Sequence, residues 1–108
     1  MREIKKEKIG EIIHRLAAEF TRDRTSDASL LTVTRVELSP TGKEARIYFT
    51  TLPENQEGTA LKFLMRKIPE FKKYIRNESS IGMIPHIKFE IDYGERNRQR
   101  LDELSKEE

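Results

Sequence analysis

Apolar residues in the first twenty positions recur with helical spacing. They lie at i, i+3, i+4, i+7, i+8 and i+11, and they are Ile9, Ile12, Ile13, Leu16, Ala17 and Phe20. Because 3.6 residues make one helical turn, this spacing gathers them on one face. It predicts an amphipathic helix from about Glu3 to about Thr21, followed by a polar loop as far as Ser29.

Residues 30–39 are rich in β-branched side chains and are predicted to form a strand, although their alternation is interrupted. The apolar positions change parity between Val33 and Val36. One extra residue in the strand would produce this change. We therefore expect a β-bulge near Thr34 and Arg35.

A turn and a second strand follow directly. Residues 39–42 (Ser-Pro-Thr-Gly) place proline and glycine where tight turns favour them. After the turn, Ala45, Ile47 and Phe49 alternate with polar residues, which predicts a second strand and an antiparallel hairpin. Residues 52–58 are predicted to form a loop in which the next helix could begin.

A broken helix and a third strand complete the predicted fold. Helical spacing continues across Pro69 through Leu61, Leu64, Met65, Ile68, Phe71, Tyr74 and Ile75. Proline lacks an N–H and its ring clashes with the preceding turn, so we expect two helices, with Pro69 in the first turn of the second. Residues 84–92 then alternate as a strand, which a right-handed crossover would place parallel to the strand before it.

This order of elements predicts one α+β domain. A chain of 108 residues is long enough for a single core. The predicted order is helix, strand, strand, helix, kink, helix and strand, with a three-stranded mixed sheet that is covered by helices on one face. We assign residues 1–94 to this domain and residues 95–108 to a polar C-terminal helix or tail, where only Leu101 and Leu104 keep helical spacing.

Composition narrows the possible environments of the protein. Charged residues make up 37% of the chain and hydrophobic residues 35%, while the net charge is only +2, so the location of charge matters more than its sum. The absence of cysteine removes disulfides, thiolate metal sites and cysteine nucleophiles. No apolar run reaches signal-peptide or membrane-spanning length. We expect a cytoplasmic protein without a membrane partner.

Candidate catalytic groups are few and isolated. Neither His14 nor His86 has a second ligand at a metal-binding spacing. Glu90 and Asp92 share one strand face and could pair as acid and base, but an open face interleaved with Lys88 offers no pocket to shift a pKa. We therefore expect no enzyme activity, and no metal, cofactor or small-molecule substrate.

Basic residues concentrate around the predicted helix break. Between residues 62 and 76 there are six basic residues and only one acid, Glu70. The basic residues are Lys62, Arg66, Lys67, Lys72, Lys73 and Arg76. Lys5 and Lys8 form a second patch in the first helix, where cations oppose the helix dipole. Such charge is often only a solvated helix face, yet a bent basic helix pair can also neutralise the phosphates of a nucleic acid. We predict RNA contacts at these eight residues, with Pro69 setting the angle between the helices.

The uncovered face of the sheet supports two rival hypotheses. Its only clear aromatic side chain is Tyr48, which disfavours an RNA-binding mode that stacks bases across the sheet. The same face could instead bind a protein, through the four residues Arg46, Tyr48, Lys88 and Glu90. The other rival is a nuclease that uses Glu90 and Asp92.

In this order, the segments resemble the ribosome-binding factor A family, whose fold is a type II K-homology domain. The resemblance rests on the basic-then-apolar first helix, on residues 31–39, 45–49 and 84–92, and on Glu95 with the tail that follows it. The family has an alanine-x-glycine kink between its two helices. This chain has Lys67-Ile68-Pro69 at that place, and Gly82 where family members often carry an arginine.

The resemblance implies a non-enzymatic, RNA-binding bacterial assembly factor. Such a protein would bind the free, immature small (30S) ribosomal subunit, assist the maturation of its 16S rRNA, and leave before translation. Its partners would be the small subunit and its rRNA, and it would act as a monomer. Asp92 would then cap or buttress the closing helix rather than touch RNA.

Overall fold

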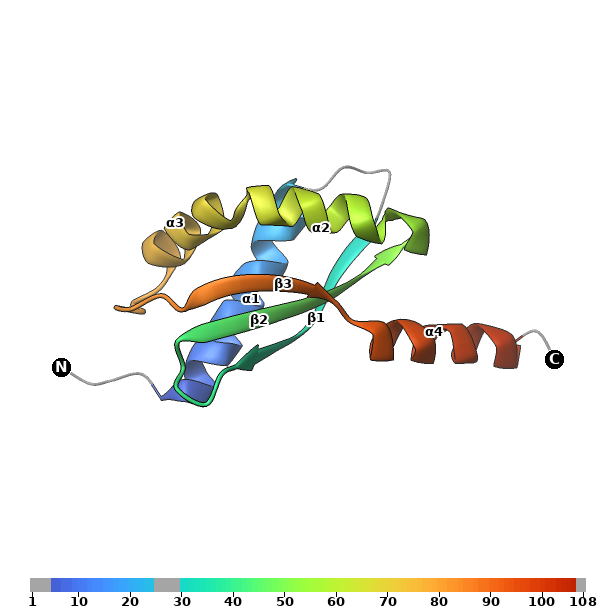
Figure 1. Cartoon of the computed structure of the whole chain (residues 1–108), viewed down its shortest axis with the longest axis horizontal. Coiled ribbons are helices and arrows are strands. Elements are labelled where there is room, and N and C mark those ends of the chain that lie inside the picture. The colour runs from blue at the N-terminus through green and yellow to red at the C-terminus, as the bar shows by residue number, and fades with distance from the viewer. Residues whose placement is uncertain (1–4, 25–29, 107–108) are drawn as a thin grey trace.

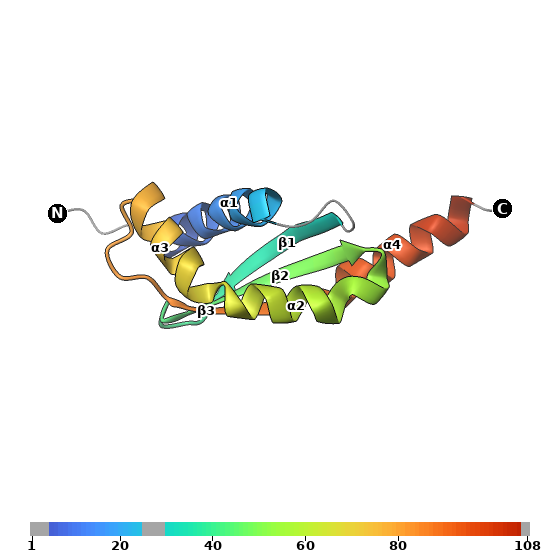
Figure 2. The same cartoon turned by 90° about the horizontal axis from the view of Figure 1, so that it is seen from above.

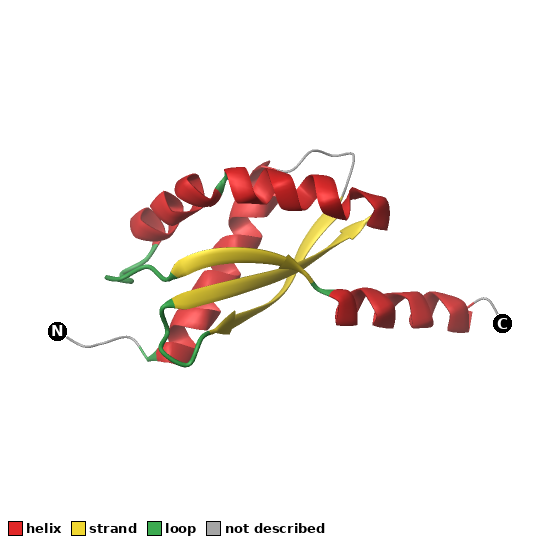
Figure 3. Ribbon diagram, in the orientation of Figure 1, coloured by secondary structure: helices red, strands yellow, loops and turns green. Residues whose placement is uncertain are grey.

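The structure is a computed structural model that describes residues 5–24 and 30–106 (Figure 1). Its elements are, in chain order, α1 (Lys6–Arg24), β1 (Leu30–Leu38), β2 (Glu44–Leu52), the 3-10 turn η1 (Glu54–Gln56), α2 (Glu57–Arg66), α3 (Ile68–Glu78), β3 (His86–Ile91) and α4 (Tyr93–Lys106). Figure 3 shows that the helices and strands are joined by short loops wherever the connection is described. This architecture confirms the predicted α+β class.

The three strands form one mixed sheet in the order β1-β2-β3. β1 and β2 pair antiparallel, while β2 and β3 pair parallel. The register of the hairpin shifts between Val33 and Arg35, which leaves Thr34 as the extra residue of a bulge. The parity change in the sequence therefore has the predicted cause.

Helices α1, α2 and α3 cover one face of this sheet. Figures 1 and 2 show α1 running along β1 and α2 running along β3, with α3 packed against α1. Three aromatic rings connect these layers: the ring centre of Phe71 lies 5.0 Å from that of Phe20 and 6.0 Å from that of Phe89. All three side chains are buried, so the core joins α1, α3 and β3.

Helix α1 ends three residues later than the sequence predicts. The Thr21 hydroxyl donates to the carbonyl of Ala17, 2.9 Å away within the helix. The Arg24 guanidinium lies 4.0 Å from the ring centre of Phe20 and pairs with Glu70 of α3. Contacts with the core and with α3 therefore keep residues 22–24 helical, although their sequence shows no helical periodicity. The predicted start at Glu3 lies outside the described residues.

The helix break occurs at Lys67, two residues before Pro69. The backbone of Lys67 has φ −92° and ψ 0°, and its N–H is shared between the carbonyls of Phe63 and Leu64. Pro69 is the second residue of α3, where it has no N–H to donate to the carbonyl of Met65. The regular hydrogen bonding of α2 therefore stops before the proline, as its chemistry requires.

One stability prediction concerns Gly10, which lies inside α1. A Cβ atom at this position would meet no atom within 4 Å, so packing does not require a glycine. Gly10→Ala should raise the free energy of unfolding by about 0.5–1 kcal/mol, measured by urea denaturation, because glycine costs that much in a helix interior. The contrasting variant Gly42→Ala should be destabilised, since Gly42 has a φ of 73°. An unchanged Gly10→Ala protein would contradict the prediction.

Candidate nucleic-acid interface

The predicted RNA-binding residues of α2 lie on its solvent face. Lys62 and Arg66 are one helical turn apart and both are exposed, while Leu64 on the opposite side is fully buried. Neither cation forms an ion pair with another described side chain. The amphipathic pattern of α2 thus leaves two adjacent positive charges free to meet an anion.

Helix α3 repeats this arrangement beyond the break. Phe71 and Ile75 are fully buried against the core. Lys73 and Arg76 are exposed and lie on the side of the helix away from the core, while Lys72 is half-buried and lies at the edge between the two sides. Among the described side chains, none of these cations has an ion-pair partner. The structure therefore gives α2 and α3 one basic face each.

The single acid near the break is already neutralised. The Glu70 carboxylate lies 3.4 Å from the Lys67 ammonium and 3.6 Å from the Arg24 guanidinium. Lys67 also lies 5.6 Å from the ring centre of Phe63. Lys67 is therefore partly engaged within the protein, in contrast to the other five cations of the helix pair.

Lys5 lies just before α1 and Lys8 lies in its first turn, at the end of this helix that is far from α3. Both are exposed, and their neighbour Lys6 donates to the carbonyl of Pro40 in the β1–β2 turn, 3.2 Å away. α1 meets α3 through Phe20, which lies about 18 Å further along the helix than Lys8, given a rise of 1.5 Å per residue. These two lysines therefore form a patch of their own beside the hairpin turn.

The sheet face opposite α1–α3 carries no exposed aromatic ring among the described residues. Tyr48 is only 9% exposed, because the Arg35 guanidinium lies 3.9 Å from its ring centre. Its hydroxyl donates to Glu37, and burial raises the pKa of Tyr48. The sequence interpretation of Tyr48 as an exposed aromatic is wrong, since it could not foresee that Arg35 would cover it. The proposed protein-binding set keeps Arg46 and Lys88 as exposed members.

Asp92 is a buried carboxylate that links β1 to the start of α4. Its buried carboxylate accepts hydrogen bonds from Thr34 at 2.6 Å, from Arg35 at 3.2 Å and from the backbone N–H of Glu95 at 3.0 Å. Burial alone would raise the pKa of Asp92, but these three hydrogen bonds outweigh it and hold the pKa below its usual value. Asp92 therefore caps α4, as the resemblance implied.

Helix α4 begins at Tyr93 and depends on ion pairs that sequence reasoning missed. Arg96 donates to Glu57 at 2.8 Å, and Arg100 donates to Glu54. The hydrogen bond from Arg100 holds the pKa of Glu54 below its usual value. The sequence gives one hint of these pairs: Glu54 and Glu57 are about one helical turn apart, and so are Arg96 and Arg100. This spacing does not show which acid pairs with which arginine, and only the folded structure does.

The described residues offer neither a metal centre nor a membrane-spanning helix. No group of three histidine, aspartate or glutamate side chains in residues 5–24 and 30–106 could hold a metal ion. No helix of these ranges is long and apolar enough to cross a membrane.

Comparison with known proteins gives consistent results. A family model described as ribosome-binding factor A matches residues 5–105. Ribosome-binding factor A of Staphylococcus epidermidis is 26% identical, with 98% of this chain and 97% of that protein aligned. That of Dichelobacter nodosus is 31% identical over 93% of this chain and 88% of its own length.

The three-dimensional structure is similar to that of a solved relative. The crystal structure of ribosome-binding factor A from Thermus thermophilus superimposes with a TM-score of 0.70 at 25% sequence identity. The superposition covers 81% of this chain and 94% of that one. Sequence and structure agree over most of the chain, and the chain therefore belongs to the ribosome-binding factor A family.

Proposed function

We propose that this protein is a non-enzymatic ribosome assembly factor that binds RNA of the free, immature small (30S) subunit. The observation that carries the proposal is the pair of exposed basic faces on α2 and α3, on either side of the break at Lys67. The family match and the names of the relatives support the ribosome as the partner. The protein would act as a cytoplasmic monomer, with residues 1–94 as its RNA-binding domain.

The proposed contact works by phosphate neutralisation. Each phosphate of the 16S rRNA backbone at this contact would meet one cation, and the cations are Lys62 and Arg66 on α2, Lys67 at the break, and Lys72, Lys73 and Arg76 on α3. Such contacts position a protein on RNA without reading its sequence. The axes of α2 and α3 differ in direction because the helix breaks at Lys67. The two basic faces could therefore contact successive parts of an RNA backbone that bends. Lys5 and Lys8 would add a second contact beside the hairpin turn.

A role in maturation follows from binding that depends on the shape of the rRNA. The cations are held on packed helices, so the distances among them are fixed before binding. A backbone segment of the immature subunit that matches these distances would be held in place. When the rRNA refolds into its mature form, the match is lost and the protein leaves. The protein would thus assist 16S rRNA maturation without any chemical step.

The proposal is tested by the binding of purified protein to immature and mature small subunits at several salt concentrations. We expect tighter binding to immature subunits, and a fall in affinity of about a hundredfold or more between roughly 50 and 200 mM salt, because each phosphate contact releases counterions. Equal binding to both subunits would contradict the role in maturation. Binding that hardly changes with salt would instead favour the rival protein–protein module.

A further inference from the structure

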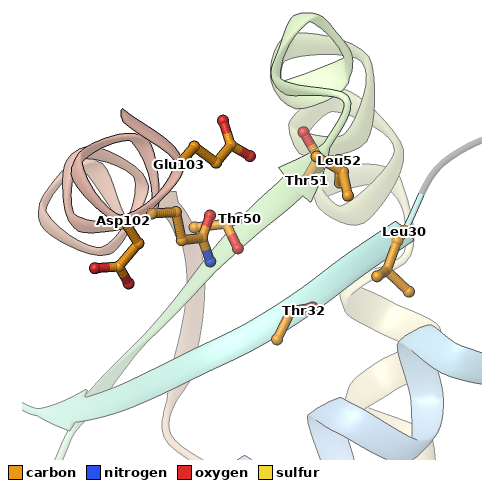
Figure 4. Close-up of a pocket in the computed structure, with 8 residues that line it drawn as sticks. Leu30, Thr32, Thr50, Thr51, Leu52, Asp102 and Glu103 are labelled. Carbon is orange, nitrogen blue, oxygen red and sulfur yellow. The ribbon is translucent and has the colours of Figure 1, made fainter. Parts of the chain in front are cut away.

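Helix α4 projects from the sheet and its covering helices (Figure 1), and none of its apolar side chains in residues 93–104 is buried. Leu101 and Leu104 are 64% and 61% exposed. A groove of about 290 Å³ separates α4 from the ends of β1 and β2, and Asp102 points away from these strands (Figure 4). Apolar packing therefore does not hold α4 against the rest of the protein.

Polar contacts hold α4 instead, at its start and along one side. At the start, the Asp92 cap fixes α4 to the sheet. Along the side, the Arg96 guanidinium donates to Glu57 at 2.8 Å. One turn further on, Arg100 donates through Nε and Nη2 to both carboxylate oxygens of Glu54. Because its first turn is anchored to the sheet, α4 can act on the element that its arginines contact.

That element is the beginning of α2. Glu54 is the first residue of η1, and Glu57 is the first residue of α2. Neither η1 nor α2 has a side-chain hydrogen bond at its N-cap within the described structure. In the first turn of α2, Glu57 is buried and Ala60 is half-buried, whereas the fully buried apolar residue of this helix is Leu64, two turns on. The ion pairs therefore hold the end of α2 where apolar contact is least.

The Arg96–Glu57 pair fixes geometry more than it adds stability. Its two side chains are 20% and 11% exposed, so both charges lose most of their hydration. Glu57 Oε2 and Arg96 Nε are buried without a hydrogen-bond partner among the described residues. A buried ion pair that is incompletely hydrogen-bonded adds little stability, because its attraction barely offsets the cost of dehydration. It does, however, define one arrangement of the two helices that it joins.

We propose that Arg96 and Arg100 are positioning residues for the RNA contact, because they set the direction of α2. That direction in turn places Lys62 and Arg66 relative to the cations of α3. Lys62 lies about midway between the first turn of α2 and the break at Lys67, so it would move about half as far as a released helix end. The inference rests on the proposed function, since it concerns the same RNA contact, and α4 would act without touching RNA.

The test changes the more exposed of the two pairs and measures binding to immature small subunits. Glu54→Arg should weaken binding by about fivefold or more although it adds positive charge, because Arg100 then repels the start of α2 and displaces its phosphate contacts. Exchange of the pair, Glu54→Arg with Arg100→Glu, restores both the attraction and the net charge, and its affinity should return to within about twofold of the unchanged protein. Unchanged or tighter binding by Glu54→Arg, or no recovery on exchange, would overturn the proposal.

The matched control is Glu103→Arg. It adds the same charge at an exposed position of α4, and no other described side chain forms an ion pair with Glu103. Its binding should be unchanged or slightly tighter, because it alters only the overall field. A loss as large as that of Glu54→Arg would overturn the proposal, since any added charge near α4 would then have the same effect.

A double-mutant cycle separates positioning from a general structural defect. In a protein that already carries Lys62→Gln and Arg66→Gln, Glu54→Arg should change the affinity by less than about twofold, because α2 has no phosphate contact left to lose. An equal loss in both backgrounds would indicate a structural defect and contradict positioning. If Lys62→Gln with Arg66→Gln itself loses no affinity, the proposed function fails as well. Thermal unfolding of each variant checks its folding.

Discussion

Replacement of Asp92 by alanine should lower the free energy of unfolding by about 2–4 kcal/mol, the largest stability effect that we expect from a polar residue. The carboxylate accepts three hydrogen bonds, from Thr34 on β1, from Arg35 on β1 and from the first turn of α4. Alanine would leave the half-buried Thr34 hydroxyl and a helix end without their acceptor. Urea denaturation measures the difference directly.

Two variants control this prediction. Thr34→Val removes one of the three donors and should cost only about 1 kcal/mol, since the remaining hydrogen bonds persist. Asp102→Ala removes an exposed carboxylate of α4 and should change the stability by less than about 0.5 kcal/mol. If Asp92→Ala were no more destabilising than Asp102→Ala, the assigned role of Asp92 as the link between the sheet and α4 would be wrong.

The same carboxylate predicts a dependence of stability on pH. Because its pKa is lower in the folded than in the unfolded protein, Asp92 contributes its full stabilisation above its usual pKa of 3.8. That contribution is lost as the pH falls through the lower folded value. The stability difference between the unchanged protein and Asp92→Asn should therefore be constant from neutral pH to about 5 and should narrow below about 4.

Charge reversal at Lys72 and Lys73 should lower the affinity for small-subunit RNA by about a hundredfold or more at moderate salt. Each substitution by glutamate removes one phosphate contact and adds one repulsion, and the slope of log affinity against log salt should fall by about 2. Lys73 is exposed and Lys72 is half-buried, and neither belongs to the fully buried face that Phe71 and Ile75 form. The fold should therefore be retained, which circular dichroism can check.

The matched control reverses two cations that are outside both predicted RNA contacts. Arg98, on α4, and Lys88, on β3, are both exposed, and their change to glutamate alters the net charge by the same amount. We expect a small loss from the changed overall field and an almost unchanged salt slope. A loss as large as that of the Lys72 and Lys73 variant would show that net charge, and not the face of α3, governs binding.

Much of this fold was predictable from the sequence because it depends on local chemistry. The parity change between Val33 and Val36 predicted the bulge at Thr34, since side chains alternate strictly along a strand. Pro69 predicted a helix break, which the structure places at Lys67, because a missing N–H ends the hydrogen-bond ladder whatever surrounds it. The apolar face of α1 followed from helical periodicity in the same way.

The candidate sites were only partly predictable, because their side chains contact residues that are distant in the sequence. The sequence showed where the cations of α2 and α3 concentrate, but it did not show that Glu70 of α3 pairs with Arg24 of α1. It also suggested an exposed Tyr48, which Arg35 in fact covers. The eight RNA-binding residues remain a prediction that the binding experiments above address.

By itself, the sequence determined which segments are helices and strands, where they break, and on which helices positive charge gathers. Only the tertiary structure decided the partners of Asp92, the pairing of Arg96 with Glu57 and the covering of Tyr48 by Arg35. The physical reason is separation along the chain: Asp92 meets Thr34 across 58 positions, and Arg96 meets Glu57 across 39. Periodicity and turn chemistry act over a few residues, whereas such contacts exist only after the sheet and its helices have packed.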